Sequence, residues 1–474
     1  MNRLAVFSVM GHTILVFVGL LIYVLATRIG QQRRTPSAAI GWVVGIVAFP
    51  YVTLPLFLVF GTRKMTRPQH HTRGNNVPTP PGGPGWVTQF LESMELPPPV
   101  RNERLVWHDD GPDALKSLVA IIDSAERTLD LCTFILGNDE VGKLVADALL
   151  RAKQRGVTVR VLVDAVGSMK TLPRHLETLR AAGISVQRFM PFLHNPREGR
   201  INLRNHRKVT IADGVRMWSG GRNIAVEYFY DRPGEPAWVD LSHDATGAVA
   251  MQASTLFESD WRTASGEVRS ASAPVAVPAP LVGTPPPQPP SPQPDTGPWA
   301  QWVSTGPDHA DDTVHALLVA AGYHAKKRIL AVTPYFVPDD ALLDAWCMAC
   351  RRGVDVNLIV PHQSNHVLAD WARERSLREL CAAGAKVWLA PTMVHAKAVM
   401  VDDDLGLSGS LNLDARSLFL NYEVMTAFYS TEQLLWLASW FDRHMASATP
   451  YQAKRPGLFR DIGEGIVRSI GFQL

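Results

Sequence analysis

The pattern of apolar and polar positions divides most of the chain into two halves that repeat each other. Residues 118–136 and 144–164 give, in order, an amphipathic helix, an apolar β-rich run, a second helix, an Arg-Gly-Val turn and a buried strand. Residues 317–337 and 342–361 give the same order. Strands that alternate with helices of about a dozen residues indicate βαβ units on a mostly parallel or mixed sheet. The pattern therefore predicts a duplicated α/β domain.

The beginning of the chain has no such alternation. Leu4–Thr27 and Ala38–Phe60 contain no charged residue, and each is long enough to cross about 30 Å of hydrocarbon as a helix. Pro50 and Pro55 lie in the second stretch, so both a full span and a kinked or re-entrant segment are open. A cleaved signal peptide fits less well, because a second apolar stretch follows at once. We expect a two-segment membrane hairpin within residues 1–73, and the basic residues around it favour a cytoplasmic location for the rest of the chain.

Two proline-rich stretches mark the linkers. The first lies in residues 74–103, between the membrane segments and the first α/β half at 104–264. The second lies in residues 265–298 and precedes the other half at 299–474. Its segment Pro274–Pro298 has no apolar periodicity, which is typical of an extended, semi-rigid spacer.

Each half carries the same string of polar residues on or just before a strand. The string is His-x-Lys-x-x-x-x-Asp, followed by a glycine pair or Gly-Ser and then an asparagine. The two copies consist of His206, Lys208, Asp213, Gly220, Gly221 and Asn223, and of His395, Lys397, Asp402, Gly409, Ser410 and Asn412. Because side chains alternate along a strand, each histidine shares a face with its lysine. One such pair is ordinary surface decoration, but its repetition in both halves indicates a catalytic role.

These residue types suit chemistry on a phosphate. Histidine titrates near neutrality and serves as a nucleophile or as a general acid and base. Two lysines and two asparagines at one point would hold the oxygens of a phosphate and the charge of its transition state. Two histidines on opposite sides of the phosphorus allow a two-step displacement. The sequence therefore predicts phosphoryl-group chemistry at a site shared by the two halves.

Other classes of site are less well supported. The run Asp402–Asp404 suggests metal catalysis, but it enters a turn, and the lysines supply the positive charge that a divalent ion would bring. Cys347 and Cys350 have no second pair to complete a zinc site and lie in an apolar pattern typical of a buried helix. A net charge of +3 does not indicate a nucleic-acid partner. We expect no metal and no cofactor.

The paired strings resemble those of the phospholipase D superfamily. The flanking residues 220–229, 238–247, 333–339 and 409–423 are similar to bacterial cardiolipin synthases, as are the two apolar segments. The resemblance covers nearly the whole chain. It implies two phospholipase D-like domains that share one active site at a pseudo-twofold interface. It also implies a multi-pass enzyme of the bacterial cell membrane that makes cardiolipin and glycerol from two molecules of phosphatidylglycerol, through a phosphatidyl-histidine and without a metal.

The resemblance also implies roles for single residues. His206 is expected to be the nucleophile and His395 the general acid and base, although the residues alone do not rank them. Lys208, Lys397, Asn223 and Asn412 are expected to hold the phosphate, with Ser410 as a weaker candidate. Glu227 and Glu423 follow the two strings and are expected to orient the imidazoles, each bracing the histidine of the opposite half. Asp213 and Asp402 complete the motifs, and a structural role, tying strand to turn, is the favoured interpretation.

Three further features bear on the substrate. Arg197, Arg200, Arg204 and Arg207 precede or interrupt the first string, where they form a solvated loop or attract anionic lipid headgroups. The C-terminal residues 457–474 are weakly amphipathic and can lie on a bilayer. Where the family often has an aspartate after the strand that ends at residue 361, this chain has Asn365 and His366. A phospholipase D-type phosphodiesterase that hydrolyses phospholipids, or less plausibly nucleic acid, is the alternative function.

Overall fold

The structure is a computed structural model of the chain. It describes residues 3–29, 36–61, 64, 79–169, 173–190, 202–266, 296–454, 456–457, 460 and 463–465. Arg197, Arg200 and most of both the proline-rich spacer and the C-terminal segment lie outside the described residues.

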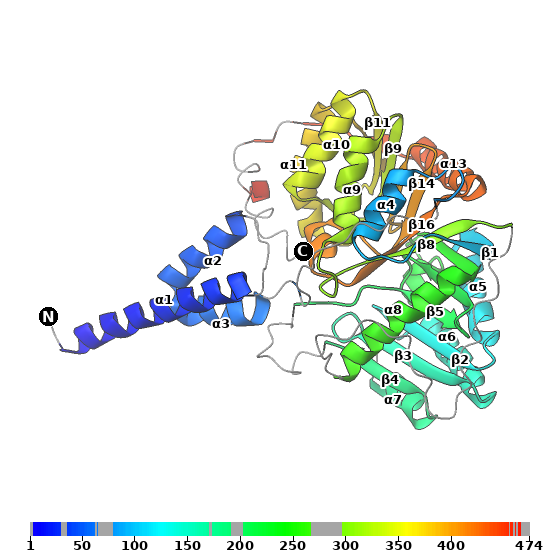
Figure 1. Cartoon of the computed structure of the whole chain (residues 1–474), viewed down its shortest axis with the longest axis horizontal. Coiled ribbons are helices and arrows are strands. Elements are labelled where there is room, and N and C mark those ends of the chain that lie inside the picture. Colours follow the sequence, from blue (N-terminus) through cyan, green and yellow to red (C-terminus); the bar gives the residue numbers. More distant parts are fainter. Residues whose placement is uncertain are drawn as a thin grey trace.

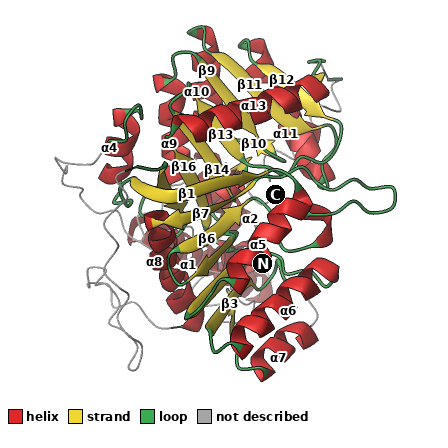
Figure 2. Ribbon diagram, turned by 90° about the vertical axis from the view of Figure 1, so that its right-hand side faces the viewer, coloured by secondary structure: helices red, strands yellow, loops and turns green. Residues whose placement is uncertain are grey.

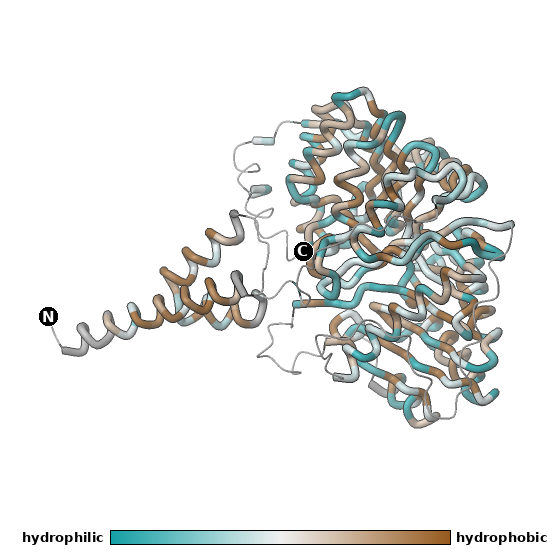
Figure 3. The backbone as a smooth tube through the Cα atoms, in the orientation of Figure 1, coloured by the Kyte–Doolittle hydropathy of each residue, from teal (hydrophilic) through white to brown (hydrophobic). Residues whose placement is uncertain are grey.

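Three apolar helices precede the catalytic halves (Figures 1 and 3). They are α1 (Arg3–Ile29), α2 (Pro36–Ala48) and α3 (Pro50–Phe60). By length and composition one of them can cross a membrane, through its window Met10–Thr27. Tyr23, Ile46 and Phe57 form a small core between them, but most of their large apolar side chains are exposed, as for Phe17 at 71%, so this core accounts for only part of their composition.

The second predicted membrane segment is not one continuous helix. Pro50 begins α3, and Phe49 before it has φ −138° and ψ 60°, outside the helical region. A residue that precedes proline is pushed toward extended conformations, which breaks the helix at this point. The prolines left open a full span and a kinked or re-entrant segment, and the structure has an interrupted segment. A hairpin of two full membrane spans is therefore not confirmed.

The two halves form one continuous mixed sheet, as predicted for a duplicated α/β domain. The strand order is β17-β12-β11-β9-β13-β14-β16-β8-β1-β7-β6-β5-β2-β3-β4. The strands of the first half are β1 (Val100–His108), β2 (Thr128–Thr133), β3 (Thr158–Asp164), β4 (Ser185–Phe189), β5 (Val209–Ala212), β6 (Arg216–Gly220) and β7 (Ser242–Gly247). Those of the second half are β8 (Trp299–Thr305), β9 (Arg328–Val332), β11 (Asp355–Pro361), β12 (Lys386–Ala390), β13 (Ala398–Val401), β14 (Leu405–Gly409), β16 (Glu423–Phe428) and β17 (Thr449–Pro450). A separate pair, β10 (Phe336–Val337) and β15 (Leu413–Asp414), runs parallel.

Helices cover both faces of this sheet (Figure 2). In the first half they are α5 (Gly111–Asp123), α6 (Glu140–Gln154), α7 (Pro173–Ala181), the 3-10 helix η2 (Val226–Tyr228) and α8 (Ala248–Ser265). In the second half they are α9 (Thr313–His324), α10 (Asp340–Arg351), α11 (Val367–Ala382), α12 (Ala415–Phe419) and α13 (Thr431–Ser447). The short α4 (Gly85–Ser93) precedes the first half in sequence and packs on α9. Cys347 is buried on α10, as expected for a core helix.

The two faces of the sheet have different cores. On one face a single apolar cluster joins both halves and includes Phe257 of α8 and Leu437 of α13. On the other face each half has a core of its own, one under α5, α6 and α7 and one under α9, α10 and α11. The shared core and the pairing of β1 with β8 fix the halves relative to each other, and this places their two strings at one junction.

Candidate active site

Reciprocal backbone bridges bring the two histidines to that junction. The N–H of His206 donates to the carbonyl of Tyr422 in the other half, at 2.9 Å, and the N–H of His395 donates to the carbonyl of Val239, at 2.7 Å. The histidine of each half is thus placed by the residue that precedes an acidic residue of the opposite half. The pseudo-twofold relation expected from the repeat is visible in these two bonds.

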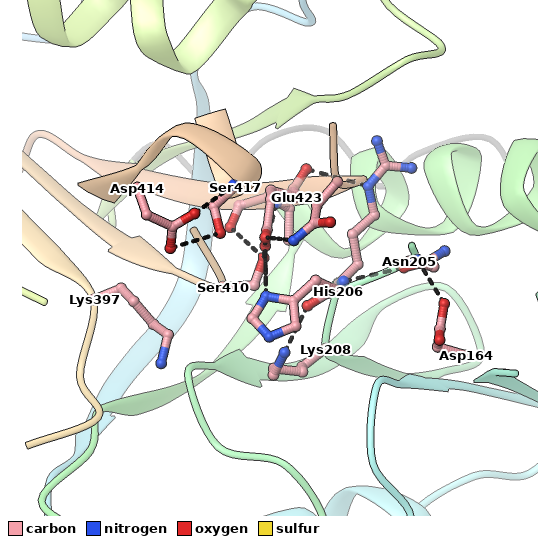
Figure 4. A network of polar contacts seen from close by, with 12 residues as sticks. Asp164, Asn205, His206, Lys208, Lys397, Ser410, Asp414, Ser417 and Glu423 are labelled. Carbon is pink, nitrogen blue, oxygen red and sulfur yellow. Dashed lines mark hydrogen bonds and ion pairs between the residues drawn. The ribbon is translucent and has the colours of Figure 1, made fainter. Parts of the chain in front are cut away.

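Each histidine is braced by the acid that follows this bridge. Nδ1 of His206 lies 2.9 Å from Oε1 of Glu423, and Nδ1 of His395 lies 2.7 Å from Oδ2 of Asp240. Both acids are fully buried. A carboxylate at Nδ1 holds the proton on that nitrogen and leaves the lone pair on Nε2. Figure 4 shows the imidazole of His206 between Glu423 and Lys208.

The prediction that each acid braces the opposite histidine therefore holds in geometry for Glu423, but the choice of Glu227 was wrong. Glu227 is only partly buried on η2 and takes no part in the hydrogen bonds of either histidine within the described part of the chain. Asp240 occupies the position that corresponds to Glu423. Glu423 is the first residue of β16, whereas Asp240 lies two residues before β7, and no spacing rule in the sequence singled out Asp240.

The small residues after each string leave room for these acids. A Cβ atom on Gly221 would lie 2.2 Å from Oδ1 of Asp240, so only glycine fits there. The corresponding residue of the second half is Ser410, whose hydroxyl donates to Oε2 of Glu423 at 2.5 Å. Ser410 is thus placed as a support for the acid, and it is not among the residues that line the cavity.

Both lysines are buried, and the side chain of each folds back onto the backbone of its own string. Nζ of Lys208 donates to the carbonyl oxygen of His206 at 2.7 Å, and Nζ of Lys397 donates to that of His395. Burial lowers the pKa of Lys208 to about 8 despite the carboxylate of Glu423. Burial and the charge of Lys208 lower the pKa of Lys397 to about 7, against the effect of Asp240. A phosphate oxygen beside these two groups would stabilise the charged form of both.

The two imidazoles are neutral near pH 7. Burial lowers the pKa of His206, although Glu423 opposes the shift. Burial and Lys397, whose Nζ lies 2.6 Å from Nδ1 and 3.0 Å from Nε2, lower the pKa of His395 to about 3. Their ring neighbours differ, since Phe134 packs edge-on against His206, whereas Tyr228 and Trp238 contact His395. A neutral imidazole with its lone pair on Nε2 is the form that can act as a nucleophile.

A cavity of about 390 Å³ lies over the two histidines. Asn223 and Asn412 line it, and the Oδ1 atom of each is buried without a hydrogen-bond partner among the described residues. Nδ2 of Asn223 lies 2.7 Å from the hydroxyl of Tyr228, which also lines the cavity. The wall from the second half carries more polar groups, namely Tyr335, Asn365, His366, Asp414, Arg416 and Asn421. Asn365 and His366, which depart from the family pattern, therefore face the same space as the histidines.

Asp213 and Asp402 lie at the far end of each string, beyond strands β5 and β13. Asp213 accepts hydrogen bonds from the backbone N–H groups of residues 126, 127 and 128, and Asp402 from those of residues 326, 327 and 328. Both have left-handed φ, +55° and +51°. The geometry agrees with the structural interpretation, in which each aspartate ties the turn after its strand to the strand beside it.

Arg207 was expected in a solvated loop or beside lipid headgroups, and that prediction was wrong. It is fully buried, and its guanidinium pairs with Asp260 at 2.5 Å and with Asp308 of the other half at 3.2 Å. It also donates to the backbone carbonyl of Glu423. It therefore joins the halves rather than meeting solvent or headgroups. Arg204 does line the cavity.

No group of three or more histidine, cysteine or acidic side chains is placed to hold a metal ion within the described residues. The basic residues of the cavity instead suit an anion directly. The arrangement can bind a phosphate and present a neutral imidazole to its phosphorus from either half.

Comparisons with known proteins agree with this geometry. A family model described as "Cardiolipin synthase, PLD-like domain" matches residues 118–261 and 320–445. The chain is 30% identical over 432 residues to cardiolipin synthase A of Pectobacterium carotovorum subsp. carotovorum, covering 85% of this chain and 86% of that protein. It is 30% identical over 429 residues to the major cardiolipin synthase ClsA of Bacillus subtilis, covering 84% and 85%. In fold it is similar to phosphatidylserine synthase of Haemophilus influenzae, with a TM-score of 0.61 at 15% identity over 82% of this chain and 100% of that one.

Proposed function

The chain belongs to the cardiolipin synthases with phospholipase D-like domains, and from that premise we propose that it makes cardiolipin and glycerol from two molecules of phosphatidylglycerol. The observation that carries the proposal is the pair of cross-braced histidines over one basic cavity. Two imidazoles at one phosphorus suit an exchange of one alcohol for another. A transfer between two lipids needs two steps, the departure of the first alcohol and the attack of the second.

In the first step Nε2 of His206 attacks the phosphorus of one phosphatidylglycerol. The bond from phosphorus to the glycerol oxygen breaks, and that oxygen takes a proton from His395, so that glycerol leaves. Glu423 keeps the proton of His206 on Nδ1 and stabilises the positive charge that the ring gains. The product of this step is a phosphatidyl-histidine and free glycerol.

In the second step the neutral His395 accepts a proton from a hydroxyl group of the second phosphatidylglycerol. The oxygen then attacks phosphorus, the P–N bond breaks, and cardiolipin forms. His395 must be protonated at the start of the cycle, although its pKa before a phosphodiester binds is about 3. A bound phosphodiester supplies a negative charge beside the ring and draws Lys397 onto its oxygens, and both effects raise that pKa.

The lysines and asparagines would hold the phosphate oxygens. Among the described residues Lys208 and Lys397 donate to backbone carbonyls and form no ion pair with a carboxylate, so each can turn toward an anion. If the amide of Asn223 rotates by half a turn, the hydroxyl of Tyr228 donates to Oδ1 and the NH₂ group faces the cavity. The negative charge of the transition state would then be met by two ammonium groups and two amides.

The membrane location is part of the same proposal. We infer that the apolar N-terminal helices anchor the enzyme in the bacterial cell membrane as a two-segment hairpin, with both catalytic halves on the cytoplasmic side. The exposed apolar surface of α1, α2 and α3 supports burial in lipid. The basic residues on either side of the apolar segments support the orientation. Phosphatidylglycerol in the same bilayer then serves as both donor and acceptor.

The test is to supply the purified enzyme with labelled phosphatidylglycerol in vesicles. The expected products are cardiolipin and glycerol, one molecule of each per two of phosphatidylglycerol consumed. Phosphatidic acid as the main product would instead support the hydrolytic alternative, in which water attacks the phosphatidyl-histidine. The double variant His206→Ala/His395→Ala is the control for background conversion.

A further inference from the structure

The cavity that contains the two histidines opens beside the start of α11. Val367 and Leu368 line that cavity and are nevertheless 62% and 50% exposed. Trp371, which is 51% exposed, follows one helical turn after Val367 on the same face. Single exposed apolar residues are ordinary, but three large ones together at the mouth of a cavity indicate a contact surface.

The first half exposes an apolar residue in the corresponding loop. Met169 is 65% exposed and follows β3, as the start of α11 follows β11. Its loop packs on Phe134, a cavity residue, because the hydroxyl of Ser168 donates to the carbonyl of Phe134 at 2.9 Å. Apolar side chains thus stand exposed at the start of α11 and in the loop beside Phe134, and we call Met169, Val367, Leu368 and Trp371 the lip.

The chain that leaves the apolar helices is fixed to the half that carries most of the lip. Nζ of Lys64 donates to the carbonyl of Gly306 at 2.9 Å and pairs with Asp312 at 2.9 Å. Asp308 of the same loop pairs with Arg207, the neighbour of His206. Figure 1 shows α11 on the side of the catalytic halves from which the N-terminal helices project. The anchor therefore holds this side of the cavity toward the membrane.

We propose that the lip inserts into the interface of the bilayer, so that a phospholipid passes from the membrane into the cavity without crossing water. The inference rests on the proposed function, because only a lipid substrate needs such a passage. A bilayer fits this surface better than a protein partner, since the lip is continuous with the cavity that must receive the lipid. Tryptophan is also the side chain that best suits the level of the headgroups.

The kinetic test compares two substrates in the full-length enzyme, reconstituted in phosphatidylethanolamine vesicles. Dioleoyl-phosphatidylglycerol is presented in the same bilayer, and dihexanoyl-phosphatidylglycerol is added as monomers from water. The variant Met169→Ser/Trp371→Ser changes two lip residues that do not line the cavity. We expect about a tenfold loss of kcat/KM on the dioleoyl substrate and less than a twofold loss on the dihexanoyl substrate.

The matched control is Leu435→Ser, which removes a 65% exposed leucine from α13 on the opposite face of the sheet. It should leave both rates unchanged. Equal losses on both substrates in the lip variant, or no loss on either, would overturn the proposal. Failure of the wild-type enzyme to convert either substrate would instead count against the proposed function.

A second readout does not depend on turnover. A benzophenone amino acid in place of Trp371 should form a photoadduct with the acyl chains of the vesicle lipid, and the same probe in place of Leu435 should not. Residue 463 lies beside the ring of Trp371, so some adducts to that neighbour are expected. Adducts within the chain alone, with none to lipid, would show that the chain covers the lip, and adducts to lipid at both positions would show that the contact is unspecific. Either result would overturn the proposal.

Discussion

The two buried lysines should make the binding of a phosphate-like anion strongly dependent on pH. The pKa values of Lys397 and Lys208 are about 7 and about 8. A bound anion stabilises the charged form of each lysine and raises its pKa, so binding is coupled to protonation. The anion therefore binds best below pH 7, and its affinity falls as the pH rises through the two values.

The size of the effect follows from the two protonation equilibria. At pH 6 both lysines are charged in about nine-tenths of the molecules, and at pH 8 in about one-twentieth. At pH 9 the fraction is roughly one-thousandth. Affinity should therefore fall about 20-fold from pH 6 to 8 and about 1,000-fold from pH 6 to 9. Burial lowers the pKa of both imidazoles. Where the bound anion raises the pKa of His395 enough to protonate it, as in the proposed reaction, the fall in affinity is steeper than the lysines alone give.

The assay is inhibition by micromolar tungstate, which is a dianion over this whole range. Its inhibition constant is measured at half-unit steps from pH 6 to 9 in detergent solution. In the variant Lys397→Arg one of the two titrating groups stays charged over the whole range. The loss of tungstate affinity between pH 6 and pH 9 should therefore be about tenfold instead of about 1,000-fold. A constant that does not change with pH in the wild-type enzyme would refute the description of the two lysines as the anion site.

Other predictions test single parts of the site. Asp240→Asn should lower kcat by roughly 10²- to 10⁴-fold, because an amide does not fix the tautomer of His395. The kcat of Glu227→Gln should stay within about twofold of the wild-type value. Equal losses of kcat in the two variants would show that Glu227 also supports catalysis. Asp402→Ala should lower the free energy of unfolding in urea by about 1–3 kcal/mol through lost hydrogen bonds to backbone N–H groups, and a large loss of kcat without a loss of stability would show a catalytic role instead. Exhaustive chelation should leave turnover nearly unchanged, and activity that collapses and then returns with magnesium or zinc would contradict the phosphate site described above.

The repeat and most of the site could be predicted from the sequence because both depend on local patterns. The alternation of strands and helices places each His-Lys pair at the start of a strand, and two copies imply a shared site. Glu423 could be predicted because it closely follows its own string, and the structure places it at the start of the buried strand β16. The structural role of Asp402 could also be anticipated from the turn that follows it.

What could not be predicted depends on contacts between the halves. The partner of His395 is Asp240, which lies 155 residues away in the chain, and two acids near the first string compete for that role. Arg207 looks like one of a set of solvated arginines, but Asp260 and Asp308 bury it between the halves. Nothing in the spacing of charges along the chain distinguishes these cases.

Each half supplies the acid that hydrogen-bonds to the histidine of the other half, which explains why the two halves must act together. Without the second half, His206 would lose Glu423 and the backbone carbonyl of Tyr422 that fixes its position. Arg207 would lose Asp308, and strand β1 would lose its partner β8. The neutral imidazole, its tautomer and the buried cation beside it thus all depend on the interface. A single half carries a complete His-x-Lys string but lacks the groups that, in the proposed mechanism, would make its histidine a nucleophile, and this would tie catalysis to the duplication.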